Sequence, residues 1–168
     1  MAYLLDANVF IQAKNLYYGL DFCPAFWDWL IAANTAQRVF SIEKVAAEIA
    51  GGGDELADWA EHRASGFFLQ PDTEMLPALG TVSTWATGQA YEPAAVSTFL
   101  QVTDYYLVAH ALAHRHTLVT HEVASNTTKK IKIPNACIGL GIRCMSPFDM
   151  LRRERARFVL ARQARSAG

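Results

Sequence analysis

Residues 1–14 of the chain read MAYLLDANVFIQAK, and the run Leu4-Leu5-Asp6 within them decides the fold that we predict. The apolar residues up to Leu5 are typical of a short buried strand, yet the strand ends on the carboxylate of Asp6, and Asn8 follows two positions later. In open α/β sheets, ligands bind in the crevice at the carboxyl ends of the strands. A strand that ends on Asp therefore predicts a site at that edge of a sheet.

Runs of the same kind recur along the chain and alternate with stretches that have the apolar periodicity of helices. We expect further strands over residues 38–41, 67–71, 117–122 and 142–146. We expect helices over residues 8–16, 23–34, 41–50, 54–65, 75–87, 92–101 and 103–116, with Ser41 and Thr103 as N-caps, and a basic amphipathic helix over about 147–166. This alternation predicts an α/β fold, with a parallel central sheet flanked by helices on both faces.

The size and composition of the chain fit one domain over residues 1–168. Hydrophobic residues make up 52% and charged residues 18%, which excludes general disorder. The apolar runs are too short to cross a membrane, and Asp6 falls where a leader peptide would be apolar. Cys23, Cys137 and Cys144 are odd in number and form no Cys-x-x-Cys motif, which predicts reduced thiols in a cytoplasmic protein.

The charges are divided unevenly along the chain. Residues 1–109 carry 4 Lys and Arg against 13 Asp and Glu, whereas residues 110–168 carry 11 against 3. The acidic part is suited to binding cations and the basic part to binding a polyanion. Attraction between the two parts across the fold is the alternative interpretation, and charge alone does not choose between them.

Other carboxylates occur in settings that match Asp6. Glu122 ends its predicted strand as Asp6 does, so the two side chains converge if the strands are parallel neighbours. Asp104 lies in the first turn of a predicted helix, where the helix dipole favours its ionised form. A fourth acid comes from the helix over 41–50, either Glu43 or Glu48. These two point roughly 140° apart on a helix, and each flanks the buried face, so spacing does not select one of them.

Carboxylates that gather in one crevice repel one another unless protons or cations intervene. Mg²⁺ and Mn²⁺ are hard ions that prefer oxygen ligands and keep positions for water and a substrate phosphate. Such ions generate hydroxide near neutral pH and stabilise charge on a phosphoryl group. Taken alone, each acid is an ordinary surface charge, so the prediction of a metal site rests on the set.

A zinc site is the competing interpretation, because His110, His114, His116 and His121 lie close together in the chain. His110 and His114 are one helical turn apart. No third ligand shares their helix in a recognised pattern, and zinc sites use three or four protein ligands. Zinc is therefore not expected from the sequence.

Three stretches carry a resemblance to a known family: LLDANVFI (4–11), FSIEKVAAEI (40–49) and TDYYLVAHALAHRHTLVTHE (103–122). They resemble, in the same order, an aliphatic strand ending in Asp, a Ser followed by a helix with Val-x-x-Glu, and an Asp-initiated helix followed by a strand and Val-Thr-x-acid. That ordered set is similar to the motifs of PIN-domain nucleases, in particular VapC-type toxin ribonucleases and related bacterial PIN-like proteins. The Val-x-x-Glu match selects Glu48 over Glu43.

The resemblance implies four catalytic carboxylates: Asp6, Glu48, Asp104 and Glu122. Asp6 and Asp104 would anchor the principal Mg²⁺ or Mn²⁺ ion. Glu48 and Glu122 would orient water or hold a second ion, with Glu122 as a further metal ligand. The family more often has Asp in place of Glu122, which leaves the number of ions open.

The resemblance also implies polar supports for these acids, Asn8 and Thr120. The implied activity is Mg²⁺- or Mn²⁺-dependent endoribonuclease cleavage by the toxin of a bacterial toxin–antitoxin pair. The expected partners are RNA, a cognate antitoxin and a second copy in a homodimer. The basic segment Lys129, Lys130 and Lys132 would bind the RNA backbone. A non-catalytic PIN-like module that binds RNA or protein is the alternative.

Overall fold

The strands follow from the short apolar runs in the sequence, and together they form a parallel sheet. The computed structural model describes residues 1–63 and 66–160. Within them, five strands lie in the order β3-β2-β1-β4-β5, and every neighbouring pair is parallel. The strands are β1 (Tyr3–Leu5), β2 (Val39–Ile42), β3 (Phe68–Leu69), β4 (Thr117–Val119) and β5 (Cys144–Met145).

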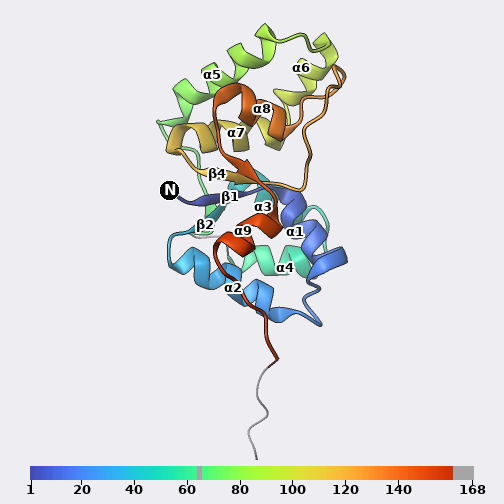
Figure 1. Ribbon diagram of the computed structural model, residues 1–168, viewed down its shortest axis with the longest axis vertical. Coiled ribbons are helices and arrows are strands. Elements are labelled where there is room, and N and C mark those ends of the chain that lie inside the picture. Colours follow the sequence, from blue (N-terminus) through green and yellow to red (C-terminus); the bar gives the residue numbers. More distant parts are fainter. Residues whose placement is uncertain (64–65, 161–168) are drawn as a thin grey trace, which may run out of the picture.

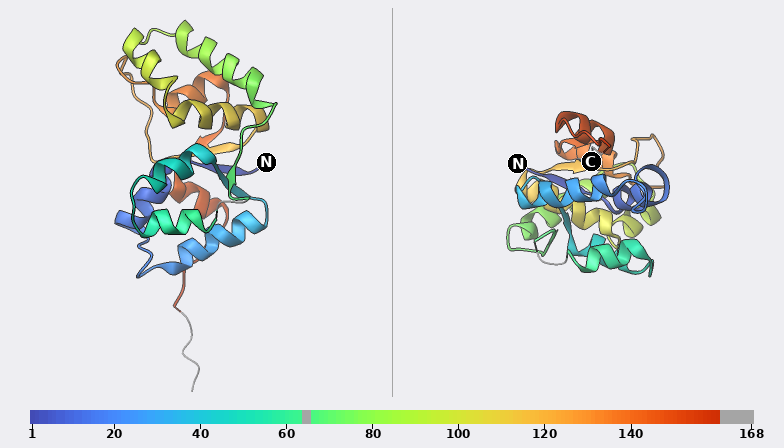
Figure 2. Two further views of the ribbon diagram at one scale, coloured as in Figure 1. Left: turned by 180° about the vertical axis from the view of Figure 1, so that it is seen from behind. Right: turned by 90° about the horizontal axis from the view of Figure 1, so that it is seen from below.

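Helices cover both faces of this sheet. In Figure 1, α5, α6, α7 and α8 lie above the strands and α1, α2, α4 and α9 lie below them, and the reverse view in Figure 2 agrees. The helices are α1 (Ala7–Gln12), the π-helical turn η1 (Ala13–Tyr17), α2 (Pro24–Thr35), α3 (Glu43–Ala50), α4 (Glu55–Glu61), α5 (Met75–Gly88), α6 (Pro93–Phe99), α7 (Thr103–His114), α8 (Ile133–Leu140) and α9 (Pro147–Arg153). The predicted α/β class is confirmed.

The order of the strands puts β1 at the centre, between β2 and β4. The chain proceeds from β1 to β2 and β3 on one side, and then crosses to β4 and β5 on the other. The change of direction lies between β1 and β4, and crevices form at such points outside the carboxyl ends of the strands. Asp6 follows β1 and Thr120 follows β4, so both lie at this point.

The core is made from the strands and the inner faces of the helices. Leu4 and Leu5 of β1 and Leu118 and Val119 of β4 are fully buried, because helices cover both faces of a parallel sheet. Since the backbone at the centre of the sheet is enclosed, the residues that follow β1 and β4 have little freedom to move apart. No helix among residues 1–63 and 66–160 is long and apolar enough to span a membrane.

Two predicted N-caps are wrong. Ser41 lies inside β2, fully buried, and its hydroxyl donates to the carbonyl oxygen of Leu5 at 2.6 Å. The N-cap of α3 is Ile42, and that of α7 is Val102, with Thr103 as the first helical residue. Ser41 thus ties the end of β1 to β2, directly before Asp6.

The basic C-terminal helix is much shorter than the predicted 147–166. It ends at Arg153, and Arg155 adopts a left-handed conformation with φ 53°. The backbone N–H of Ala156 donates to Leu151 and that of Arg155 to Arg152, which is the Schellman pattern that ends a helix. Residues 156–160 are not helical, and residues 161–166 lie outside the described residues, as do 64–65 of the helix predicted over 54–65.

Candidate functional site

The carboxyl ends of β1 and β4 bring Asp6 and Thr120 into direct contact. The Thr120 hydroxyl donates to Asp6 Oδ2 at 2.8 Å and accepts from Asn8 Nδ2 at 3.0 Å and from the Glu122 backbone N–H at 3.1 Å. Asn8 Oδ1 accepts from the His121 backbone N–H at 3.0 Å. Asn8 and Thr120 therefore link the two strand ends and fix the Asp6 carboxylate, although neither is next to it in sequence.

Burial and mutual repulsion perturb the acids at this edge. Burial, then the charge of Asp104 and, less, that of Glu122, raise the pKa of Asp6 to about 7. Burial, the charge of Glu122 and that of Glu48 raise the pKa of Asp104 to about 6, against the opposing effect of Lys130. The favourable helix dipole expected at Asp104 is therefore outweighed. We call the group Asp6, Glu48, Asp104 and Glu122 the acidic crevice, after the crevice expected outside the carboxyl ends of β1 and β4.

The structure places Glu48 and Glu43 on different sides of α3. Glu48 is close enough to Asp104 for its charge to raise the pKa of that residue. Glu43 instead lines a small cavity together with Tyr106 and His110. Of the two acids that spacing alone could not separate, Glu48 is thus the one whose charge reaches Asp104.

Glu122 makes contacts that the sequence did not predict. Its Oε2 accepts from the Ile133 backbone N–H at 2.8 Å, at the start of α8, and its Oε1 lies 3.1 Å from Lys130 Nζ. The bond to Glu122 and the nearby charges of Asp104 and Asp6 raise the pKa of Lys130. Glu122 therefore anchors α8, and the Lys130 ammonium partly neutralises the crevice.

The three basic residues of the connection between β4 and α8 differ in their surroundings. Lys129 is exposed, Lys130 reaches Glu122, and Lys132 is the half-buried N-cap residue of α8. Only part of the positive charge of this predicted RNA-binding segment is therefore exposed and available to a nucleic acid. Figure 1 shows the connection running along one side of the molecule, from the sheet up to α8.

The donor atoms of the crevice fit a hard divalent cation, because all four side chains are carboxylates and repulsion among them is incompletely relieved. They are not drawn together as tightly as bound ligands. Among residues 1–63 and 66–160, the ligand atoms of Asp72, His110 and His114 all lie within 4.8 Å of one another, and no three acids of the crevice meet that limit. We call this second group the histidine cluster.

The third member of the histidine cluster was missed because it is far away in sequence. His110 and His114 belong to α7, whereas Asp72 precedes α5. Asp72 Oδ1 accepts from the Glu74 and Met75 backbone N–H groups, so the residue reads in the sequence as a helix-start acid. Nothing in the sequence signals that it faces α7.

An aromatic group beside the crevice was also missed. Tyr17 stacks on His121, with ring centroids 5.5 Å apart, and packs edge-on against Phe148 at 5.0 Å. His121 and Phe148 line a surface groove together with Glu122, Ile138 and other residues. Tyr17 is exposed at the surface.

Comparison with known proteins gives a family for the chain. The model of the family described as domain of unknown function DUF4411 matches residues 3–158. The chain belongs to this family. No curated protein matches it. Among solved structures, the chain is similar to the one titled "Crystal structure of VapBC2 from Rickettsia felis bound to a DNA fragment from their promoter". That similarity covers 87% of this chain and 98% of the other, with 17% sequence identity and a TM-score of 0.49.

Proposed function

We propose that this member of the DUF4411 family is a PIN-like, Mg²⁺- or Mn²⁺-dependent endoribonuclease whose active site is the acidic crevice. The observation that carries the proposal is the mutual effect of its acids. Asp6 and Asp104 belong to separate parts of the chain, yet burial and the charges of the other acids in the crevice raise their pKa values to about 7 and about 6. Buried carboxylates whose charges also repel one another are suited to binding a divalent cation.

The residues of the chain have distinct tasks in this proposal. Asp6 and Asp104 hold the ion, and Thr120 and Asn8 keep the Asp6 carboxylate in a fixed orientation. Glu48 is exposed at the edge of the crevice, where it is suited to orient a water molecule. A bound ion of this kind stabilises negative charge on a phosphoryl group and lowers the pKa of water.

Features beside the crevice favour a nucleic-acid substrate. Lys130 supplies positive charge next to the acids, and the exposed Lys129 precedes it in the same connection. The Tyr17–His121 stack offers a planar surface to an unpaired base. A single strand whose bases are unstacked matches this combination better than a duplex does. The role as a toxin, with an antitoxin partner and a homodimeric state, rests on the motif resemblance.

The test is cleavage of a fluorescently labelled, mixed-sequence single-stranded RNA by the purified protein. We expect cleavage with Mg²⁺ or Mn²⁺, none in a chelator, and a loss of at least about 100-fold in Asp6→Asn, because the ion loses a charged ligand. Asp28→Asn is the matched control, since Asp28 is exposed on α2, away from the crevice. Circular dichroism and thermal unfolding establish that both variants fold. Equal cleavage by Asp6→Asn and wild type would refute the proposal.

A second candidate function is a non-catalytic RNA-binding module. It is favoured by one observation, the engagement of both Glu122 oxygens by Ile133 and Lys130. In that case the protein binds the same RNA but does not cleave it in the presence of either Mg²⁺ or Mn²⁺. Binding that is unaffected by Asp6→Asn and reduced by Lys129→Ala would identify this function.

A further inference from the structure

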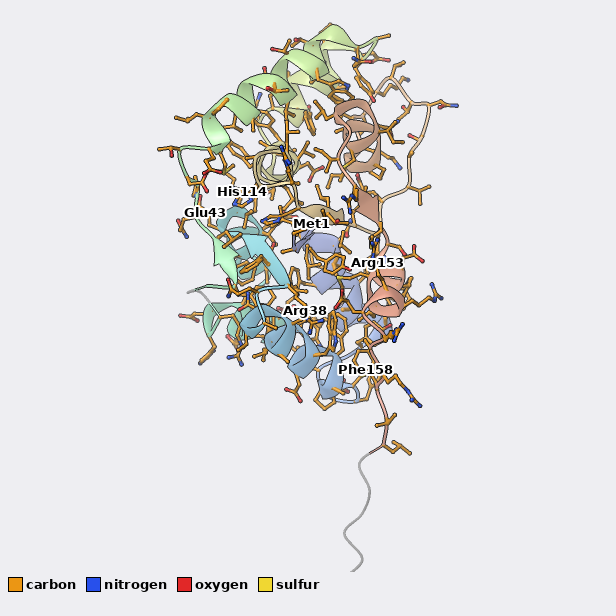
Figure 3. All side chains as sticks on the ribbon, turned by 60° about the vertical axis from the view of Figure 1, so that its left-hand side comes forward. Met1, Arg38, Glu43, His114, Arg153 and Phe158 are labelled. Atoms are coloured by element: carbon orange, nitrogen blue, oxygen red, sulfur yellow. The ribbon has the colours of Figure 1, made fainter. Side chains whose placement is uncertain are left out.

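The last two turns of α7 present a cluster of ligands that the proposed nuclease does not use. His110 and His114 are four residues apart and therefore lie on one face of α7. Asp72, between β3 and α5, reaches the same face, and His114 Nε2 lies 2.8 Å from Asp72 Oδ2. Figure 3 shows His114 near Glu43, on the side of the molecule away from Phe158.

His110 is the unexplained member of this group. It is 2% exposed, and both of its ring nitrogens are buried without a hydrogen-bond partner. The small cavity beside it has a mainly apolar accessible surface, so it is poorly suited to hold a water that would bond His110. A buried nitrogen of this kind is unfavourable unless a ligand uses it.

An ion pair between His114 and Asp72 does not explain the arrangement. Their facing atoms are 2.8 Å apart, but His114 Nε2 lacks a hydrogen bond of proper geometry. An ion pair would also leave both nitrogens of His110 unpartnered. One cation bound by all three side chains accounts for the short approach of His114 and Asp72 and for the orientation of His110.

The surroundings already orient two of these ligands. Asp72 Oδ1 is held by the Glu74 and Met75 backbone N–H groups at 3.0 and 3.1 Å, which leaves Oδ2 facing the cluster. Glu74 Oε2 lies 3.5 Å from His114 Nδ1. A carboxylate at Nδ1 favours the tautomer whose Nε2 lone pair points to a metal, which is the usual arrangement around metal-binding histidines.

We propose that Asp72, His110 and His114 form a binding site for Zn²⁺, separate from the acidic crevice. Two imidazoles and one carboxylate suit zinc and not Mg²⁺, which prefers oxygen ligands alone. Asp72 is at the surface, so a fourth position is open to water or to a further ligand. Because α5 packs along α7 and Asp72 lies three residues before the start of α5, the ion would fasten these two segments to each other.

The test is direct zinc binding by the full-length protein after removal of metals with a chelator. Titration calorimetry should give one strongly bound Zn²⁺ per chain, and Zn²⁺ at about 100 times its Kd should raise Tm by roughly 5–10 °C. Co²⁺ in place of Zn²⁺ should produce the intense visible absorption of a four-coordinate site. Absence of stoichiometric zinc binding would overturn the proposal.

Matched variants locate the site. His110→Phe, which fills an apolar position, and Asp72→Asn, which keeps the oxygen that accepts from Glu74 and Met75, should each weaken zinc binding at least about tenfold. His62→Asn, an exposed histidine at the end of α4, and Asp6→Asn should leave it unchanged. Binding that is lost in Asp6→Asn but kept in Asp72→Asn would place zinc in the crevice and overturn the proposal. If His110→Phe does not fold, the Asp72→Asn result decides.

Discussion

The two ends of α7 carry titratable groups of opposite kind, an acid at the first end and histidines at the other, and burial shifts their pKa values in opposite directions. Asp104 in the first turn belongs to the acidic crevice, whereas His110 and His114 in the last turns belong to the histidine cluster. Ten residues, about 15 Å of helix, separate Asp104 from His114. At the first end, burial raises the pKa of Asp104 to about 6, and at the other, burial and then His114 lower that of His110 to about 4.

Burial opposes charge at both ends, so each group shifts toward its neutral form, but the groups left behind differ. The crevice offers oxygen atoms that gain most from a hard cation. The cluster offers neutral imidazole nitrogens, which gain most from a borderline transition metal. If both proposed sites bind metal, one helix supports two sites of different selectivity, because the chemistry of the donors and not the degree of burial sets the preferred ion.

The largest expected effect comes from separating the two sites by one substitution. Asp104→Asn should lower metal-dependent RNA cleavage about 10²–10³-fold, because the variant loses a charged ligand where negative charge develops on the substrate. Its Zn²⁺-induced rise in Tm should equal that of the wild type. Initial cleavage rates and thermal unfolding on the same samples measure both. Loss of the zinc effect would show that the two ends of α7 are one site.

The stability of the metal-free protein should depend on pH with opposite signs at the two sites. The folded pKa of Asp6, about 7, lies above the ordinary 3.8, so its contribution to stability is present below about pH 4 and is lost as pH rises to 7. The loss is of the order of 2–4 kcal/mol. His110 and His116, with pKa values lowered to about 4, act oppositely, because their contribution is present above pH 6.5 and is lost as pH falls.

Urea unfolding in the presence of a chelator, at several pH values between 4.5 and 8, separates the two contributions. The free energy of unfolding of each variant is compared with that of the wild type at every pH. The free energy of unfolding of Asp6→Asn minus that of the wild type should rise with pH across this range. The same difference for His110→Phe should fall between pH 4.5 and 6.5. Each variant removes one group whose proton uptake differs between the folded and unfolded states. A flat Asp6→Asn difference curve would contradict the raised pKa of Asp6.

A smaller effect is expected at Glu122, which serves both the crevice and α8. Glu122→Ala should lower the free energy of unfolding by about 1 kcal/mol, because the Ile133 N–H loses its acceptor at the start of a helix. Glu122→Gln keeps an acceptor oxygen and should lose less than half of that. Urea unfolding at pH 7.5 makes the comparison. Equal losses in the two variants would mean that the charge, and not the hydrogen bond, stabilises α8.

The smallest expected effect concerns the cation supplied by the chain itself. Lys130→Met should raise the affinity of the crevice for Mn²⁺ about threefold, because an exposed ammonium near the acids competes only weakly with an ion. Lys129→Met is the control, since Lys129 is exposed and has no ion pair within 4.0 Å in the described part of the chain. Electron paramagnetic resonance measures the concentration of free Mn²⁺ during a titration and so gives the affinity. A weaker affinity in Lys130→Met would show that this lysine organises the crevice.

Several features could be predicted from residues close together in sequence. The apolar runs at 3–6, 38–41 and 117–122 indicated buried strands, and the structure has strands within or overlapping them at 3–5, 39–42 and 117–119. Their alternation with helical periodicity indicated a parallel sheet, as the structure has it. Because parallel strands end at one edge, Asp6 and Glu122 were expected near each other, and the charge of Glu122 does act on Asp6. Ser41 was wrongly predicted as an N-cap because its residue type favours caps, whereas burial in the sheet places it inside β2. The last helix was predicted too long because its apolar periodicity continues past the Schellman turn that ends it.

The sequence by itself indicated the α/β class, the alternation of strands with helices, Asp6 after a strand and Asp104 in the first turn of a helix, because these depend on local periodicity and on the backbone preferences of neighbouring residues. The expected strand end at Glu122 is wrong, since β4 ends at Val119. Only the tertiary structure decided that Lys130 lies on Glu122 and that Asp72 meets His110 and His114. Asp72 is 38 residues from His110. Contacts across such separations follow from how helices pack on the sheet, and the missing partner of a buried nitrogen can be recognised only after its surroundings are known.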